Sequence, residues 1–390
     1  MARLRLADVA VVGLGAVGSA VAHHLAAGGA KVLGLDRFHP PHPHGSSHGA
    51  TRITRLAIGE GDDYVPIVRR SHALWRALEA ESGETLMTTT GGLVIASAGS
   101  DRLPYHGRPG FFEQTCSAAE RFGIVHERLD AAEIRRRFPA FMPADDEQGY
   151  WERDAGILSP ERCVAAQLRA AGARGADLRY GVRVDGFESH ADSVTLATDA
   201  GPVSAAQVVV AAGAWLPGLL PAAEQGRFAV QRQVLHWFGL DEPALFEPGR
   251  CPVFIWIHGR RGEAFYGFPT GDGHDGAKIA TEQAERATTP AEVERTVTAE
   301  ETARTFETHV RGRLRGVLPR SVHDTTCLYT STADGRFVID RHPALQRVTI
   351  VSACSGHGFK HSAAVGEAMA DGLLGLPPRV DLRPFRLPRR

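Results

Sequence analysis

The sequence predicts an α/β protein with two domains: one assembled from discontinuous segments, and a second α+β domain with a mixed or antiparallel sheet. A glycine-rich strand–turn–helix unit stands at the start of the chain, and strand-like runs suited to the same sheet return in its middle and near its end. At 390 residues the chain is also too long for one small core. These observations together favour two domains.

The first unit has the spacing of a dinucleotide fingerprint. An apolar run leads into Gly13, Gly15 and Gly18, a helical stretch follows, and a second apolar run ends in Asp36. In a Rossmann-like fold such glycines allow a tight turn, a close approach to a pyrophosphate and close helix–strand packing. The helix N-terminus favours phosphate, and the acid suits a ribose hydroxyl. The alternative is a tight turn without a ligand.

The later strand-like runs lie at 176–216 and 336–372, where a glycine-rich turn precedes a helix expected from about Ser362. The intervening blocks mix strands with helical stretches, including a helix expected from Pro290, which suits a first helical position. A substrate is expected between the domains, at the carboxyl ends of the strands. The predicted first domain is 1–83, 151–217 and 326–390, and the predicted second domain is 84–150 and 218–325.

Charge and cysteine usage exclude several classes of protein. The 44 lysines and arginines nearly balance 45 aspartates and glutamates, so no basic excess indicates nucleic acid or an anionic membrane as a partner. Five scattered cysteines argue against a disulfide framework or a zinc site and favour a reducing compartment. The start of the chain leaves no room for a signal peptide, and Gly213 and Pro217 interrupt its most apolar stretch. We therefore expect a soluble, cytoplasmic protein.

The segment 39–55 is rich in histidine and arginine. Four histidines within ten residues suggest a metal, but their spacing fits no usual zinc pattern, so no metal is expected. Arg52 and Arg55 are three residues apart and would share one face of a helix. Two fixed cations there suit a phosphate, a flavin or a substrate carboxylate. A solvated basic helix face is the alternative.

Three further segments carry candidate chemistry. Lys278 lies in a strand-like run after a glycine loop, and a lysine buried there would be a functional cation, although lysines on sheets are usually exposed. Cys327 opens a short strand-like run, where a lone cysteine is normally a small core residue. The turn at 352–360 could stabilise negative charge through its N–H groups, or be an ordinary strand–helix loop with Lys360 solvated.

Taken in order, these pieces resemble the sarcosine oxidase and N-methyltryptophan oxidase group of FAD-dependent amine oxidases, within the D-amino acid oxidase-like family. The resemblance runs through nearly the whole chain. The stretches that carry it are the fingerprint with Asp36, 45–55, 61–66, 213–215, 266–269, Lys278, 327–329 and 355–360.

The resemblance implies a role for each matching residue. Cys327 matches a cysteine bonded to the 8α carbon of FAD, Lys278 a lysine that activates oxygen, and Arg55 and Lys360 a pair that holds the substrate carboxylate. The implied catalytic residues are Lys278, Arg52, His48, Tyr266 and Tyr329. The implied substrate-binding residues are Arg55, Lys360 and Glu282. The implied cofactor-binding residues are Gly13, Gly15, Gly18, Asp36, Ser46, Thr51, Arg52, Val184, Gly213, Trp215, Cys327, Gly356, His357, Gly358 and Lys360.

The implied activity is oxidation of a secondary or N-methylated amino acid to an imine, with hydrogen peroxide as the second product, by a monomer whose partners are its substrate and oxygen. The alternatives are a dehydrogenase of the same fold with another electron acceptor, a nicotinamide-dependent dehydrogenase, and a flavin-binding subunit of a larger oxidase.

One position departs from the pattern of the sarcosine-oxidising relatives. They carry a histidine four residues after the oxygen-activating lysine, where this chain has Glu282. A carboxylate near the substrate favours a cationic group over an anionic one. We expect either a larger or basic amino acid as the substrate, or a strand placed so that Glu282 faces away.

Overall fold

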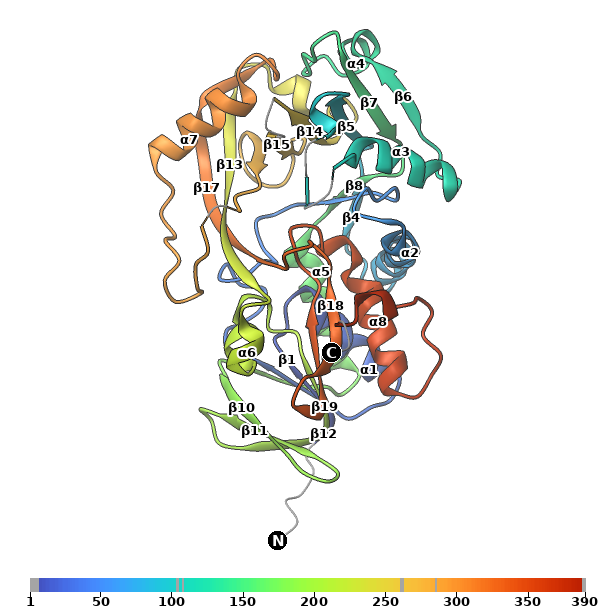
Figure 1. Cartoon of the computed structure of the whole chain (residues 1–390), viewed down its shortest axis with the longest axis vertical. Helices are drawn as coiled ribbons and strands as arrows, with labels where there is room; N and C mark the ends of the chain where they lie inside the picture. The colour runs from blue at the N-terminus through green and yellow to red at the C-terminus, as the bar shows by residue number, and fades with distance from the viewer. Residues whose placement is uncertain (1–6, 103–104, 107–108, 260–262, 285, 388–390) are drawn as a thin grey trace.

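A computed structural model describes residues 7–102, 105–106, 109–259, 263–284 and 286–387. Two large sheets lie at opposite ends of the molecule, and the long strands β13 and β17 reach from one end toward the other (Figure 1). The predicted α/β fold class is confirmed. The domain boundaries drawn from the sequence remain a proposal, and the one between 325 and 326 falls inside β17.

The first sheet contains the fingerprint strand. Its parallel strands are β1 (Ala7–Val12), β2 (Val32–Asp36), β9 (Asp177–Tyr180), β12 (Val203–Val210) and β19 (Leu345–Ser352). Antiparallel strands β10 (Val184–Ser189), β11 (Val194–Thr198) and β18 (Val338–His342) complete it. β1 and β2 are almost wholly buried, as expected of parallel strands covered on both faces.

Helices from three distant parts of the chain pack together beside this sheet. They are α1 (Ala16–Ala27), α5 (Pro160–Ala173), α8 (Ser362–Leu373) and α2 (Val65–Ser82). A methyl group at Gly366 of α8 would lie 2.4 Å from the β-carbon of Ala20, so this glycine lets α8 and α1 approach closely. The start of α8 at Ser362 matches the predicted position.

The second sheet is mixed, as predicted: its strands are antiparallel except for the parallel pair β14 and β5. In spatial order they are β17 (Val317–Ser331), β13 (Ala229–Leu240), β16 (Ala277–Thr281), β15 (Glu263–Gly267), β14 (Val253–His258), β5 (Gly92–Ser97), β7 (Glu147–Glu152) and β6 (Glu127–Asp130). The short helices in this part are α3 (Phe111–Arg121), α4 (Ala131–Arg137) and α7 (Ala299–Thr305), whereas α6 (Ala222–Gln225) lies beside the first sheet (Figure 1). Aromatic side chains, among them Phe141, Phe254 and Trp256, fill its core.

Two local predictions are wrong. Arg52 does not share a helix with Arg55, because β3 (Arg52–Thr54) pairs with β8 (Gly156–Leu158) in a small sheet completed by β4 (Met87–Thr89). The helix expected from Pro290 is a single turn. Arg232 donates hydrogen bonds to the carbonyl oxygens of Glu294 and Thr296 and so holds the chain extended there. The next helix along the chain is α7, which begins at Ala299.

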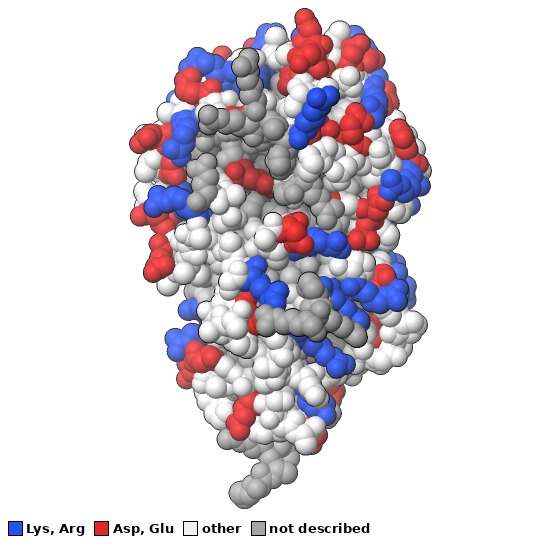
Figure 2. All heavy atoms as spheres, viewed as in Figure 1, with Lys and Arg blue, Asp and Glu red and all other residues white. Residues whose placement is uncertain are grey.

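Acidic and basic side chains intermingle over the face seen in Figure 2. Among the described residues, no helix is both long and apolar enough to cross a membrane.

Candidate functional site

A cavity of about 330 Å³ opens at the carboxyl ends of β1, β2 and β12. This is the edge of a parallel sheet at which ligands normally bind. The predicted site residues that line it are Gly13, Gly15, Asp36, Ser46, Arg52, Val184, Gly213, Trp215, Tyr329, Gly356 and Gly358. The remaining predicted residues do not line it: Gly18 packs beneath its floor, and the others lie in the buried clusters described below.

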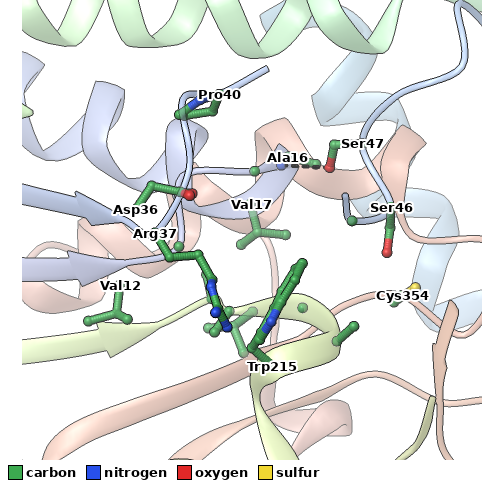
Figure 3. Close-up of a pocket in the computed structure, with 18 of the residues that line it drawn as sticks. Val12, Ala16, Val17, Asp36, Arg37, Pro40, Ser46, Ser47, Trp215 and Cys354 are labelled. Carbon is green, nitrogen blue, oxygen red and sulfur yellow. Dashed lines mark hydrogen bonds between the residues drawn. The ribbon is translucent and has the colours of Figure 1, made fainter. Parts of the chain in front are cut away.

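The glycines of the fingerprint make the floor of this cavity. Gly13 adopts a φ of 86°, and a β-carbon there would lie 2.6 Å from the carbonyl oxygen of Ala211. A β-carbon at Gly18 would lie 1.8 Å from the Gly13 carbonyl oxygen. The helix that follows has no side-chain cap of its own at Gly15. The N–H group of Ala16 donates to Ser47 Oγ at 3.1 Å (Figure 3), so an anion at this turn would bind the N–H groups that follow Ala16.

Asp36 joins the floor to the next strand. Its carboxylate accepts hydrogen bonds from the backbone nitrogens of Leu14 and Phe38, both at 2.8 Å. Each carboxylate oxygen can accept more than one hydrogen bond, so Asp36 can hold the turn and still accept from a ribose hydroxyl.

One wall of the cavity was not predicted. The guanidinium of Arg37 lies 5.3 Å from the ring centre of Trp215 and 5.1 Å from that of Phe38 (Figure 3). Arg37 directly follows the acid of the fingerprint, and that adjacency is the only signal the sequence holds for it. On the opposite side, Figure 3 shows Ser46 and the thiol of Cys354, which also lines the cavity.

Lys278 lies in β16 and is fully buried. Its Nζ donates to the carbonyl oxygens of Gly49 and Thr51, at 2.6 and 3.0 Å, and lies over the rings of Trp237 and Phe268. Burial, reinforced by a neighbouring arginine, holds the pKa of this lysine well below its usual value. Of the two placements left open by the sequence, exposed or buried, the buried lysine is the one observed.

Arg52 and His48 occupy the same region. Arg52 donates to the carbonyl oxygens of Ser46 and Thr51, both at 2.7 Å. Burial and the nearby Arg52 charge lower the pKa of His48 to about 3, so this imidazole is neutral at physiological pH. Its Nε2 has no hydrogen-bond partner among the described residues.

Cys327 lies in β17, opposite Gln233 of β13, in a small buried cluster that includes Tyr266 and Tyr329. The two tyrosine hydroxyls lie 3.2 Å apart. Burial raises the pKa of the Cys327 thiol. The thiol of Cys354 accepts from the backbone nitrogen of Thr330, at 3.4 Å, so a second cysteine lies close to this cluster.

The predicted substrate anchors Arg55 and Lys360 meet at a buried carboxylate that the sequence did not single out. Arg55 donates to Glu60 at 2.7 Å, and the Lys360 Nζ lies 3.6 Å from the same carboxylate. Burial lowers the pKa of Lys360 to about 8, although Glu60 opposes that shift. Burial likewise lowers the pKa of His357, to about 3.

A second unpredicted residue, His106, extends this cluster. Its Nδ1 lies 3.3 Å from Glu60, and its Nε2 is hydrogen-bonded to Glu282. Burial disfavours its charged form, but the two carboxylates prevail and raise the pKa of His106 to about 9. Glu282 therefore faces the cluster rather than away from it.

Known proteins of similar sequence and fold point to one family. The chain is 39% identical over 371 residues to a monomeric sarcosine oxidase of Streptomyces avermitilis, covering 93% of this chain and 92% of the relative. It is 32% identical to an N-methyl-L-tryptophan oxidase of Salmonella newport, covering 98% of each. The solved structure of NikD, described as an unusual amino acid oxidase essential for nikkomycin biosynthesis, matches with a TM-score of 0.80 at 25% identity, covering 95% of this chain and 94% of that one.

The resemblance expected from the sequence is thereby confirmed. The model of the family described as FAD dependent oxidoreductase matches residues 8–372. With nearly the whole chain matched, this protein belongs to the FAD dependent oxidoreductase family.

Proposed function

We propose that this protein is an oxidase that removes two electrons and two protons from the CH–NH group of a secondary or N-methylated amino acid and passes them to oxygen, giving an imine and hydrogen peroxide. The observation that carries the proposal is the buried Arg55–Lys360 pair at Glu60, which is connected through His106 and Glu282 to Gly356 at the dinucleotide cavity. Such a pair suits a carboxylate beside a redox cofactor. The activities named for the similar proteins support the same choice.

The residues present fit FAD. Besides the fingerprint glycines, Gly358 makes a second close turn, where a β-carbon would lie 1.7 Å from the carbonyl oxygen of Ala353. The buried polar atoms His48 Nε2 and Thr330 Oγ1 have no hydrogen-bond partner among the described residues. When bound, FAD supplies the two-electron acceptor for oxidation of the C–N bond.

The chain's own side chains bind and orient the substrate. Arg55 and Lys360 are proposed to hold its carboxylate, and Tyr266 and Tyr329 to line the substrate space next to Cys327. All four are shielded from bulk water to a large extent, which strengthens charge–charge contacts within the site.

Lys278 is proposed to act in the second half-reaction, in which oxygen accepts the electrons. Because its pKa is held low, the amine can take up a proton at Nζ when negative charge develops on oxygen beside it. Lys278→Met is expected to slow reoxidation by air much more than reduction by substrate, measured by stopped-flow absorbance. Equal slowing of the two half-reactions would contradict this role.

Cys327 is proposed to bond FAD covalently. Acid precipitation of the wild type and of Cys354→Ser should leave the yellow colour in the pellet, whereas Cys327→Ser should release it to the supernatant. Cys354 is the matched control because it lines the cavity itself. Release of FAD from the wild type would refute the bond.

The direct test of function is a peroxide assay with N-methyl amino acids, proline and pipecolate. Peroxide from at least one compound supports the proposal, and none from any contradicts it. Reduction by substrate followed by reoxidation that is insensitive to air would indicate the dehydrogenase alternative. We further propose that the protein acts as a cytoplasmic monomer, which size-exclusion chromatography with light scattering and cell fractionation would test.

A further inference from the structure

A continuous line of charged side chains leads from the proposed carboxylate anchor to Glu282. Arg55 and Lys360 contact Glu60, His106 follows at 3.3 Å, and Glu282 is hydrogen-bonded to the far nitrogen of the same imidazole. Only one imidazole ring therefore separates the two carboxylates. Glu282 therefore lies at the opposite end of this line from the anchor.

Glu282 also lies beside residues that line the cavity. A β-carbon built on Gly356 would lie 2.8 Å from Glu282 Oε1 and 3.0 Å from the ring of Tyr329, and both Gly356 and Tyr329 line the cavity. The Glu282 side chain is 25% exposed, whereas those of His106 and Glu60 are 7% and 4% exposed. Glu282 is thus the accessible end of the line.

His106 fixes one oxygen of this carboxylate and leaves the other available. The Glu282 Oε1 atom is hydrogen-bonded to the His106 imidazole, and no described residue is hydrogen-bonded to Oε2. A carboxylate accepts hydrogen bonds and donates none, and a charged N–H group is its strongest partner. Simple carboxylic acids, which lack such a group, would leave Glu282 unused.

We propose that Glu282, held in place by His106, accepts a hydrogen bond from a cationic N–H group of the substrate. The cation is either the substrate's own amine, taken up in protonated form, or a basic group on its side chain. This inference rests on the proposed function, because it takes the substrate carboxylate to lie at Arg55 and Lys360.

Matched pairs of ligands test it on the holoenzyme. 2-Aminoisobutyrate and pivalate differ only in that an ammonium group replaces a methyl group, and neither has a C–H bond next to nitrogen, so neither can reduce FAD. The pair 6-aminohexanoate and heptanoate places the cation at the far end of a chain instead. Dissociation constants are measured anaerobically by calorimetry and by the FAD absorbance change, for the wild type and for Glu282→Gln.

The wild type should bind the ammonium member of one pair about tenfold more tightly, a difference of about 1.4 kcal/mol. A preference in the first pair identifies the amine as the cation, and one in the second identifies a side-chain group. Glu282→Gln should remove the preference without weakening the uncharged member. Glu242→Gln, which removes a carboxylate from an exposed pair with Arg315, should leave it intact.

The proposal is overturned if the wild type binds both members of each pair equally, binds none of the four ligands, or keeps its preference in Glu282→Gln. The comparison of paired ligands on the wild type tests the proposal even if Glu282→Gln fails to fold. Because the first pair cannot be oxidised, the binding result is independent of the peroxide assay. A cation preference without peroxide would therefore reject the proposed oxidase and leave Glu282 as a cation acceptor.

Discussion

Raising the pH above 8 is expected to weaken binding of a carboxylate at Arg55 and Lys360. The Lys360 Nζ donates to the carbonyl oxygen of His357 at 2.8 Å and is almost wholly buried. Burial lowers the pKa of this lysine to about 8, against the opposing effect of Glu60. The group is a base, so it is cationic below that pH and becomes neutral as the pH rises through it.

The size of the effect follows from the fraction of protonated lysine. If only the protonated form binds, affinity above the pKa falls by up to tenfold for each pH unit, so the dissociation constant for pivalate at pH 9 should be about ten times that at pH 7. Arginine side chains in general do not titrate in this range. Loss of the His106 proton, with a pKa of about 9, adds to the decline at higher pH.

The assay is titration of the holoenzyme with pivalate between pH 6.5 and 9.5, monitored by FAD absorbance and calorimetry. Lys360→Arg is the matched control, because arginine keeps its charge over the whole range and should hold the affinity nearly constant up to pH 8.5. A dissociation constant in the wild type that does not change between pH 7 and 9 would refute the assignment of Lys360 as a titrating anchor.

Two further changes test the packing around the site. Gly18→Ala would place a carbon 1.8 Å from a carbonyl oxygen of the fingerprint turn and should sharply lower the FAD content per chain, whereas Gly372→Ala, which meets nothing within 4 Å in α8, should keep it; equal FAD contents would contradict this. Asp272→Ala leaves the buried indole N–H of Trp237 without its acceptor and should cost about 1–3 kcal/mol in urea denaturation. The exposed Asp275→Ala on the same loop should cost less than about 0.5 kcal/mol, and equal losses in the two would refute the role of the bond.

The parts of the fold that the sequence predicted well depend on short-range geometry. Gly13 at a φ of 86° and Gly356 at 80° are positions that a side chain would strain, so glycine there signals a turn without knowledge of the rest of the chain. The buried strand β1 and the start of α8 could be predicted for a similar reason, because an apolar run and a preceding glycine turn are local features of the sequence.

Local pattern failed where a distant partner decides the backbone. Arg52 and Arg55 have helical spacing, yet the ladder between β3 and β8 holds that stretch extended, and β8 follows about a hundred residues later. The stretch after Pro290 had a suitable helix start, but Arg232 of β13 takes its carbonyl oxygens. Helix propensity alone cannot reveal either distant partner, and such tertiary contacts override weak local preferences.

The same limit applies to the side chains around the proposed substrate anchor. Cofactor contacts come from turns whose shape demands particular residues, so they leave motifs. Glu60, His106 and Glu282 come from three separate segments, and the raised pKa of His106 and the partial exposure of Glu282 arise only when those segments meet. His106 matches no motif, yet it determines which oxygen of Glu282 is free. Substrate choice in this fold can therefore change through side chains that leave the glycine turns, and hence the recognisable family pattern, untouched.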